Sequence, residues 1–171
     1  MKIIEAMKKI KDLQIKAEDL RKKVSTYCCD TTLETPVYGK DQASKIKEWI
    51  QSHGDILKEI LKLRMAVQRT NLSTRVSIEF GSNHIGKSIA EWIHRRRDLA
   101  GFEQDIWKGI GDKNIKEGNF KTSTGDNQEV KIRRYYDPSE RDAAVELYRS
   151  EPGIIDSALE VVNAVTEIVE E

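Results

Sequence analysis

Residues 81–88, with the sequence GSNHIGKS, decide between two folds for this chain. They fit the pattern G-x-x-x-x-G-K-[ST], in which a glycine-rich loop binds the phosphates of a nucleotide. A strand-like run over 76–80 precedes them, and a helix-like run begins at Ile89. A true P-loop follows the first strand of a parallel sheet and needs a second, acidic strand for Mg²⁺. The two folds therefore differ in what the rest of the chain should contain.

The segments on both sides of GSNHIGKS lack the strands that a P-loop fold needs. Upstream, apolar residues recur in steps of three and four, which is the period of amphipathic helices. These residues are Ile3, Ala6, Ile10, Leu13, Ala17, Leu20, Val24 and Tyr27, and then Ile46, Trp49, His53, Ile56, Ile60, Leu63 and Val67, with Ile50, Leu57 and Leu61 widening the second run. Downstream, the strand-like run 130–137 (VKIRRYYD) is basic, whereas a buried parallel strand is continuously apolar. GSNHIGKS is therefore interpreted as a β-hairpin turn and return strand, followed by a helix with Ser88 and Glu91 as its capping box.

The periodicity predicts a mainly helical α+β fold with the element order ααββαββαα. The expected elements are helices from Ile3 and from about 41 to 71, strands 75–80 and 84–87, a helix from 89 to Gly109, strands 120–124 and 129–136, a short helix opening at Asp137-Pro138, and a last helix after a restart at 150–153. The two long helices form an antiparallel hairpin. With 171 residues we expect a single domain with three parts, 1–71, 72–109 and 110–171. The apolar seams are too long for one hairpin to cover, which favours assembly of several chains or packing of the C-terminal helix across them.

Charge is distributed unevenly along a chain with a formal net charge of zero. Residues 64–97 contain seven basic and two acidic residues, a net charge of +5, whereas residues 150–171 contain six acids and no base, a net charge of −6. This pattern indicates an anionic ligand, or a charge match within the chain or between subunits. The zero net charge and the acidic tail disfavour nucleic acid as a partner.

The remaining composition indicates a cytoplasmic protein that does not cross a membrane. Cys28 and Cys29 are adjacent and cannot easily bridge each other, which favours two reduced cytosolic thiols over an intersubunit disulfide. The N-terminal segment is interrupted by charges every few residues, unlike a secretory signal. Asp156, Glu160 and Glu167 interrupt the apolar C-terminal run, so it should not span a membrane.

The run His94-Arg95-Arg96-Arg97-Asp98 carries the strongest chemical signal. On the helical stripe between Trp92 and Leu99, the α-helical period directs Arg96 toward the apolar face, and Arg95 and Arg97 toward solvent or a subunit boundary. A buried guanidinium must be paired. Either Glu103 pairs with Arg96, or a partner chain does, or a ligand phosphate or carboxylate fits its bidentate fork.

Three further groups are candidates for an anion site. Arg69 and Asn71 close the second helix, where a cation and a C-cap residue also stabilise the helix end. Lys87 lies next to the N-terminus of the third helix, or simply in solvent. Arg133, Arg134, Tyr135 and Tyr136 lie on the last predicted strand, where alternation sends Arg133 and Tyr135 to one face, although charges also protect an edge strand.

Neither a metal site nor a catalytic centre is predicted. His53 lies on the seam of the second helix without a neighbour at ligand spacing. No nucleophile has an evident base, and no carboxylates are paired on a recognisable scaffold, so the sequence favours a protein that is not an enzyme and needs no cofactor.

Residues 1 to about 99 resemble a family of small bacterial proteins called septicolysin-like. The resemblance is carried by the start MKIIEA with DLQ, by Arg69-Thr70-Asn71, by a short hairpin, and by the S-x-x-E helix that holds Arg96. It implies a helical, oligomeric architecture and no particular activity. The family's hairpin turn is a short Asp-Gly-type loop without the lysine-serine step, and the residues after Gly109 extend beyond the family pattern.

These observations together favour a non-catalytic homo-oligomer with an arginine-lined pocket for a small anion, with a nucleotide as the expected class. Phage proteins that sequester nucleotide immune signals offer an architectural analogy. The alternative is a structural or adaptor oligomer whose arginines only pair between helices. The candidate ligand-binding residues are Arg69, Asn71, Lys87, Arg95, Arg96, Arg97, Arg133, Arg134 and Tyr135.

Overall fold

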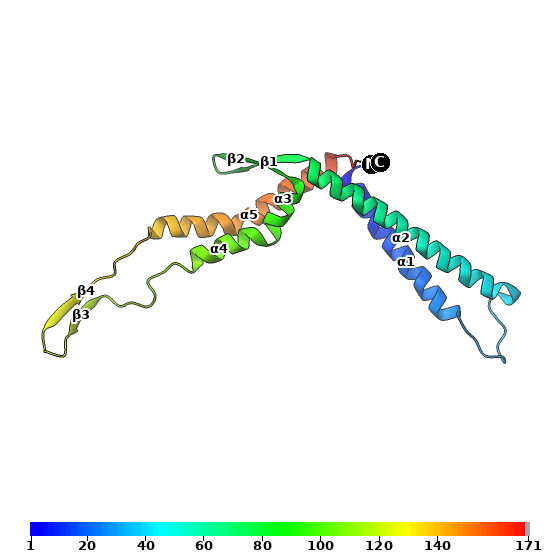
Figure 1. Cartoon of the computed structure of the whole chain (residues 1–171), viewed down its shortest axis with the longest axis horizontal. Coiled ribbons are helices and arrows are strands. Elements are labelled where there is room, and N and C mark those ends of the chain that lie inside the picture. The colour runs from blue at the N-terminus through cyan, green and yellow to red at the C-terminus, as the bar shows by residue number, and fades with distance from the viewer. Residues whose placement is uncertain (170–171) are drawn as a thin grey trace. The chain divides into compact units, whose positions relative to one another are not determined.

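The computed structural model describes residues 1–169 and confirms a mainly helical α+β fold (Figure 1). Its elements are α1 (Ile3–Tyr27), η1 (Gly39–Asp41), α2 (Gln42–Ser73), β1 (Arg75–Phe80), β2 (Asn83–Ser88), α3 (Ile89–His94), η2 (Arg95–Leu99), α4 (Ala100–Lys108), β3 (Gly118–Lys121), β4 (Asn127–Val130) and α5 (Pro138–Val165). Glu170 and Glu171, the last two acids of the predicted acidic tail, lie outside the described residues. No helix within residues 1–169 is both long enough and apolar enough to cross a membrane.

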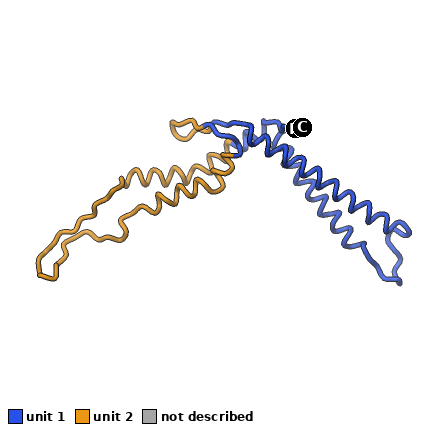
Figure 2. Tube along the Cα trace, in the orientation of Figure 1, with its two compact units in different colours: residues 1–77, 86–90, 159–171 blue, residues 78–85, 91–158 orange. Residues whose placement is uncertain are grey.

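The contacts of the chain divide it into two compact units (Figure 2). Unit 1 contains Met1–Ser77, Gly86–Ala90 and Leu159–Glu171, and unit 2 contains Ile78–Ile85 and Glu91–Ala158.

Unit 1 is built on the predicted antiparallel hairpin of α1 and α2, which lie side by side (Figure 1). The eight apolar residues of the first predicted seam are all buried or half-buried. Near the loop end of the hairpin, the rings of Tyr27, Tyr38 and Trp49 pack with centroids 5.4 to 5.9 Å apart. Ile50, Leu57 and Leu61 differ from the expectation, because all three are exposed on α2 instead of widening its buried seam.

In unit 1 the N-terminal residues bond to the segment 166–168, and Val169 bonds to the last turn of α2. The amide of Ile3 donates to the carbonyl of Thr166 over 2.9 Å, and the amide of Ile168 donates to the carbonyl of Met1 over 2.8 Å. Thr70, which is fully buried, donates its hydroxyl to the carbonyl of Ala66 over 2.8 Å and accepts the amide of Val169 over 2.9 Å. One threonine hydroxyl therefore connects α2 to the C-terminal segment.

GSNHIGKS forms a hairpin turn and return strand, as the sequence predicts. β1 and β2 pair across Gly81, whose φ of +62° is the left-handed conformation that a tight turn requires. The amide of Ile89, the first residue of α3, donates to the carbonyl of Thr74 over 3.0 Å. Over residues 1–169 the sheets are two separate two-stranded pairs, so the parallel sheet of a P-loop fold is absent from the described chain.

Two predicted boundaries in the C-terminal third are wrong. The second hairpin is shorter than predicted, because β4 ends at Val130 and residues 133–136 form a loop instead of a strand. The predicted break at 150–153 does not occur, because α5 continues through Pro152 as one helix of 28 residues. Proline removes one hydrogen bond from a helix interior. The helix continues through Pro152, and Glu151 and Ile155 on either side of it are both buried.

Replacing Thr70 with valine should destabilise unit 1, because the amide of Val169 would lose its acceptor in a buried position. We expect the free energy of unfolding to fall by about 1–3 kcal/mol, measured by urea denaturation. Thr70→Ser keeps the hydroxyl and should retain most of the stability. A Thr70→Val protein as stable as the unmodified chain would contradict this role.

Candidate functional site

The three arginines lie on a π-helical turn that interrupts an otherwise continuous helix in unit 2. η2 joins α3 to α4, and the amide of Ala100 donates to the carbonyl of Arg95, five residues earlier. One extra residue in a turn rotates all following residues by about 100° relative to an α-helix. Accordingly, Ala100 is fully buried, whereas Leu99, which the uninterrupted period places on the apolar stripe, is 44% exposed.

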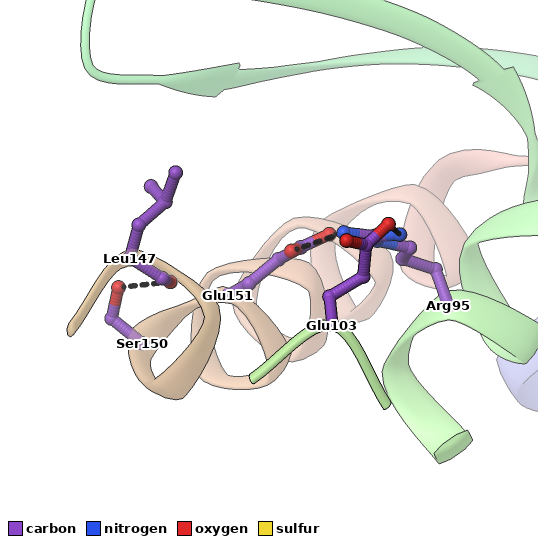
Figure 3. Close-up of polar contacts among 5 residues, drawn as sticks. All are labelled: Arg95, Glu103, Leu147, Ser150 and Glu151. Carbon is purple, nitrogen blue, oxygen red and sulfur yellow. Dashed lines mark hydrogen bonds and ion pairs between the residues drawn. The ribbon is translucent and has the colours of Figure 1, made fainter. Parts of the chain in front are cut away.

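The inward-facing arginine is Arg95, and the prediction that Arg96 has this place is wrong. The Arg95 side chain is 20% exposed and that of Arg96 is 41% exposed. Arg95 donates from Nε to Oε1 of Glu151 over 2.5 Å and from Nη2 to Oε2 over 2.9 Å, which is a bidentate ion pair (Figure 3). Glu151 is only 6% exposed. The pair connects η2 to the middle of α5.

Glu103 is the second partner of this guanidinium, whereas the sequence offers it as one of three possible partners of Arg96. Its Oε1 accepts from Nη1 of Arg95 over 3.4 Å (Figure 3). The two residues are eight apart in sequence, but the extra residue in η2 makes their spacing equivalent to seven helical positions, which lie on one face. The bond from Glu151 raises the pKa of Arg95 above its ordinary value. The ring of Tyr148 lies 5.5 Å from the guanidinium carbon.

Arg96 and Arg97 also have partners. Arg96 pairs with Asp156 of α5. Arg97 donates to Oδ2 of Asp98 over 3.2 Å and lies 3.2 Å from Nδ1 of His94, with 62% of its side chain exposed. The charge match between the basic middle and the acidic C-terminal third is therefore internal for Arg95 and Arg96.

A second site in unit 2 lies where the loop after α4 meets the loop before α5. Arg134 donates from Nε and Nη2 to the two oxygens of Asp112 over 2.8 and 2.6 Å. The hydroxyl of Tyr136 donates to Oδ1 of Asp112 over 2.9 Å. Arg141, in the first turn of α5, donates from Nη1 to the carbonyl of Ile110 over 3.0 Å. These bonds hold the two loops together without a strand.

Between these loops is an open groove of about 480 Å³, which we call the loop groove. It is lined by Gly109, Ile110, Gly111, Asp112, Lys113, Ile115, Ile132, Arg133, Arg134, Tyr135 and Tyr136. Arg133 and Lys113 have no ion-pair partner among residues 1–169. Tyr135 is 89% exposed. Arg134 is neutralised by Asp112, so the groove offers two uncompensated cations beside an accessible aromatic ring.

The other predicted residues lie elsewhere. Arg69 and Asn71 are inside α2, which continues to Ser73, so Asn71 is not the C-cap that the sequence predicts. The Oδ1 of Asn71 is buried without a hydrogen-bond partner in the described chain. Lys87 lies on β2, and both Lys87 and Arg69 already interact within the protein. These three residues belong to unit 1, whereas the arginines of η2 and of the loop groove belong to unit 2.

Within unit 2 the two arginine clusters are separate. The loop groove is held to α5 at Arg141 and the η2 cluster at Glu151, ten residues further along the helix. At 1.5 Å per residue this is about 15 Å along the axis. Residues 1–169 contain no group of three or more His, Cys, Asp or Glu side chains that could hold a metal ion.

Comparison with known proteins identifies a similar fold and no family. No family model and no curated protein matches the chain. The chain is similar to a structure described as a functionally unknown conserved protein from Corynebacterium diphtheriae, with a TM-score of 0.57 and 17% identity over 99% of both chains. At this identity the similarity shows the fold alone, and the resemblance to septicolysin-like proteins stays a prediction.

Arg95→Met should destabilise the protein strongly, because it leaves the Glu151 carboxylate buried without its partner. We expect a loss of roughly 3 kcal/mol in the free energy of unfolding, at the lower end for a buried pair because Arg95 is partly exposed. The double substitution Arg95→Met/Glu151→Leu should recover most of it. In a denaturation series, Arg97→Met is the exposed control, and an equal loss in both single variants would contradict the assignment.

Asp112 should have a pKa below the ordinary value of a carboxyl group. The hydrogen bonds from Arg134 and then Tyr136 lower the pKa of its carboxyl. A lowered pKa in the folded state means that the pair stabilises the loops above the ordinary carboxyl pKa of about 3.9, and that this stabilisation is lost as pH falls through the folded-state value. Carboxyl NMR titration of Arg134→Gln should return the Asp112 pKa toward its ordinary value. An unchanged value would show that the pairing is absent in solution.

Proposed function

We propose that the protein is a non-catalytic, homo-oligomeric binding protein that holds a small anionic ligand in the loop groove. The observation that supports this is the pair of cations, Arg133 and Lys113, which line the groove without a counter-ion among the described residues. Two uncompensated cations beside a neutralised Arg134–Asp112 pair favour binding of a ligand with about two negative charges.

The chemistry of the lining favours a nucleotide over a simple inorganic anion. Arginine binds phosphate oxygens through two parallel N–H groups, and lysine adds a compact charge. The exposed ring of Tyr135 offers a face on which a base can stack. The apolar side chains of Ile110, Ile115 and Ile132 provide the walls that a planar ring needs.

The pairing of Arg95 and Arg96 removes them from this role. Each guanidinium has a carboxylate of α5 as its partner, so a ligand phosphate would have to displace Glu151 or Asp156. This moves the proposed site from η2, which carries the strongest sequence signal, to Arg133, Arg134 and Tyr135. A protein that binds a nucleotide without turning it over would act by lowering its free concentration, as in sequestration of a nucleotide signal.

The internal pairs also favour a second candidate function, a structural or adaptor protein that binds no small ligand. In that case the exposed apolar side chains of unit 1 would be its functional surface. Ligand binding separates the two candidates.

Arg133→Ala should weaken nucleotide binding by about 10- to 100-fold, because a hydrogen bond to a charged group contributes about 1.5–3 kcal/mol. The measurement is isothermal titration calorimetry with mono-, di-, tri- and cyclic nucleotides and with inorganic phosphate. Arg97→Ala is the control, since Arg97 is also an exposed arginine of unit 2 but lies outside the loop groove.

Two outcomes would contradict the proposal. Absence of binding by any nucleotide at millimolar concentration would favour the adaptor function. Equal losses in Arg133→Ala and Arg97→Ala would show a diffuse electrostatic attraction instead of a site.

A further inference from the structure

Besides the loop groove of unit 2, the protein has a groove of about 610 Å³ in unit 1, on the surface of the α1/α2 hairpin. Its apolar part includes Leu61 and Met65, which are 61% and 40% exposed. Its charged part contains Lys9, Lys58, Lys62 and Arg69 against the single carboxylate of Glu59, a net charge of +3. We call it the basic groove. Leu61 and Met65 lie one turn apart on α2 and give this groove an exposed apolar edge.

Part of this positive charge is available to a partner. Lys9 is paired with Glu59 over 2.6 Å, and Lys58 with Asp55 over 3.1 Å. Arg69 already interacts within the protein. Lys62 has no ion-pair partner in the described part of the chain, and it lies next to Leu61. An occupant should therefore present apolar side chains with a carboxylate beside them.

The same unit carries a surface with this complementary character. Val161 and Val165 lie one turn apart at the end of α5 and are 66% and 63% exposed. Glu160 precedes Val161, and Glu167 follows two residues after Val165. Neither carboxylate forms an ion pair within residues 1–169. We call residues 160–167 the acidic ridge.

We propose that the acidic ridge of one copy of this chain docks into the basic groove of a second copy. This inference rests on the homo-oligomer in the proposed function but not on the ligand. Ile168 lines the basic groove and directly follows the acidic ridge, so the two surfaces are neighbours in one compact unit. Neighbouring complementary surfaces allow a two-fold dimer in which each copy gives its ridge and receives the other's. Valines fill the apolar part, and Glu160 faces Lys62.

The test is a charge reversal on each surface. Lys62→Glu and Glu160→Lys should each weaken the homodimer by about tenfold or more, because like charges then face each other twice. An equimolar mixture of the two variants should restore the dimer to wild-type strength. In that heterodimer one contact is the original pair and the other is the reversed pair, so no like charges meet. Sedimentation velocity gives the dissociation constants, and native mass spectrometry identifies the heterodimer by mass.

Two controls protect the result from a trivial cause. Lys22→Glu makes the same charge change on an exposed part of α1 outside the basic groove and should leave the dimer unchanged. Circular dichroism melting of each variant shows whether the fold persists, and the restored heterodimer itself requires both variants to be folded.

The inference is overturned if the wild-type chain is monomeric at a protein concentration on the order of 0.1 mM, which is about 100-fold above a typical micromolar dissociation constant of a dimer. It is also overturned by an assembly other than a dimer, or by a mixture that shows no preference for the heterodimer. Nucleotide titration of the wild-type chain keeps the two proposals distinct. A wild-type dimer that binds no nucleotide refutes only the ligand, and a wild-type monomer that binds nucleotide refutes the homo-oligomer and this interface but not the ligand.

Discussion

The ion pair between Arg95 and Glu151 is the interaction on which the organisation of unit 2 depends. A buried carboxylate without a partner costs free energy, and Arg95 supplies Glu151, which is 6% exposed, with a partner through two hydrogen bonds. The pair fixes the antiparallel alignment of α4 and α5, which Gln104 continues by donating to the carbonyl of Val145 over 3.2 Å. The same alignment ends at Arg141 and Ile110, where the loop groove begins. Arg95, which belongs to the run with the strongest chemical signal in the sequence, thus helps to position a different candidate site, the loop groove.

The helical period of the sequence predicts most of this fold. One local departure from that period accounts for the main wrong prediction, the inward position of Arg96. The seams of α1 and α2 and the hairpin of β1 and β2 follow directly from residue spacing. The π turn at η2 does not, because no residue type in Arg95-Arg96-Arg97 marks the extra position. The π turn makes Arg95 and Ala100, which are five residues apart, the inward positions, where the α-helical period predicts Arg96 and Leu99. A difference of one residue is enough to replace Arg96, the expected ligand-binding arginine, with Arg95, which pairs with Glu151.

The acidic partners were harder to predict than the arginines, although the sequence contains a signal for one of them. Pro152 and Gly153 suggest that the helix ends there. A helix end at this point divides the stripe formed by Tyr148, Glu151, Ile155 and Leu159, so the sequence does not reveal it. When α5 is continuous, these residues follow three-four spacing, and Glu151 is the charged member of an apolar face. Asp112 has no such signal, because it lies in a loop whose partners are 22 and 24 residues away. Thr70 continues the seam seven residues after Leu63, which predicts its burial but not its bond to Val169.

Arg95 and Arg133 should behave differently toward a ligand, because Arg95 pairs with Glu151 whereas Arg133 has no ion-pair partner among the described residues. Arginine Nε–Hε NMR signals during a nucleotide titration test this difference most directly, since they observe both residues in one intact protein. We expect the Arg133 signal to shift saturably while the Arg95 signal stays in place, because Glu151 holds the Arg95 guanidinium. A saturable shift of the Arg95 signal with an unmoved Arg133 signal would contradict it.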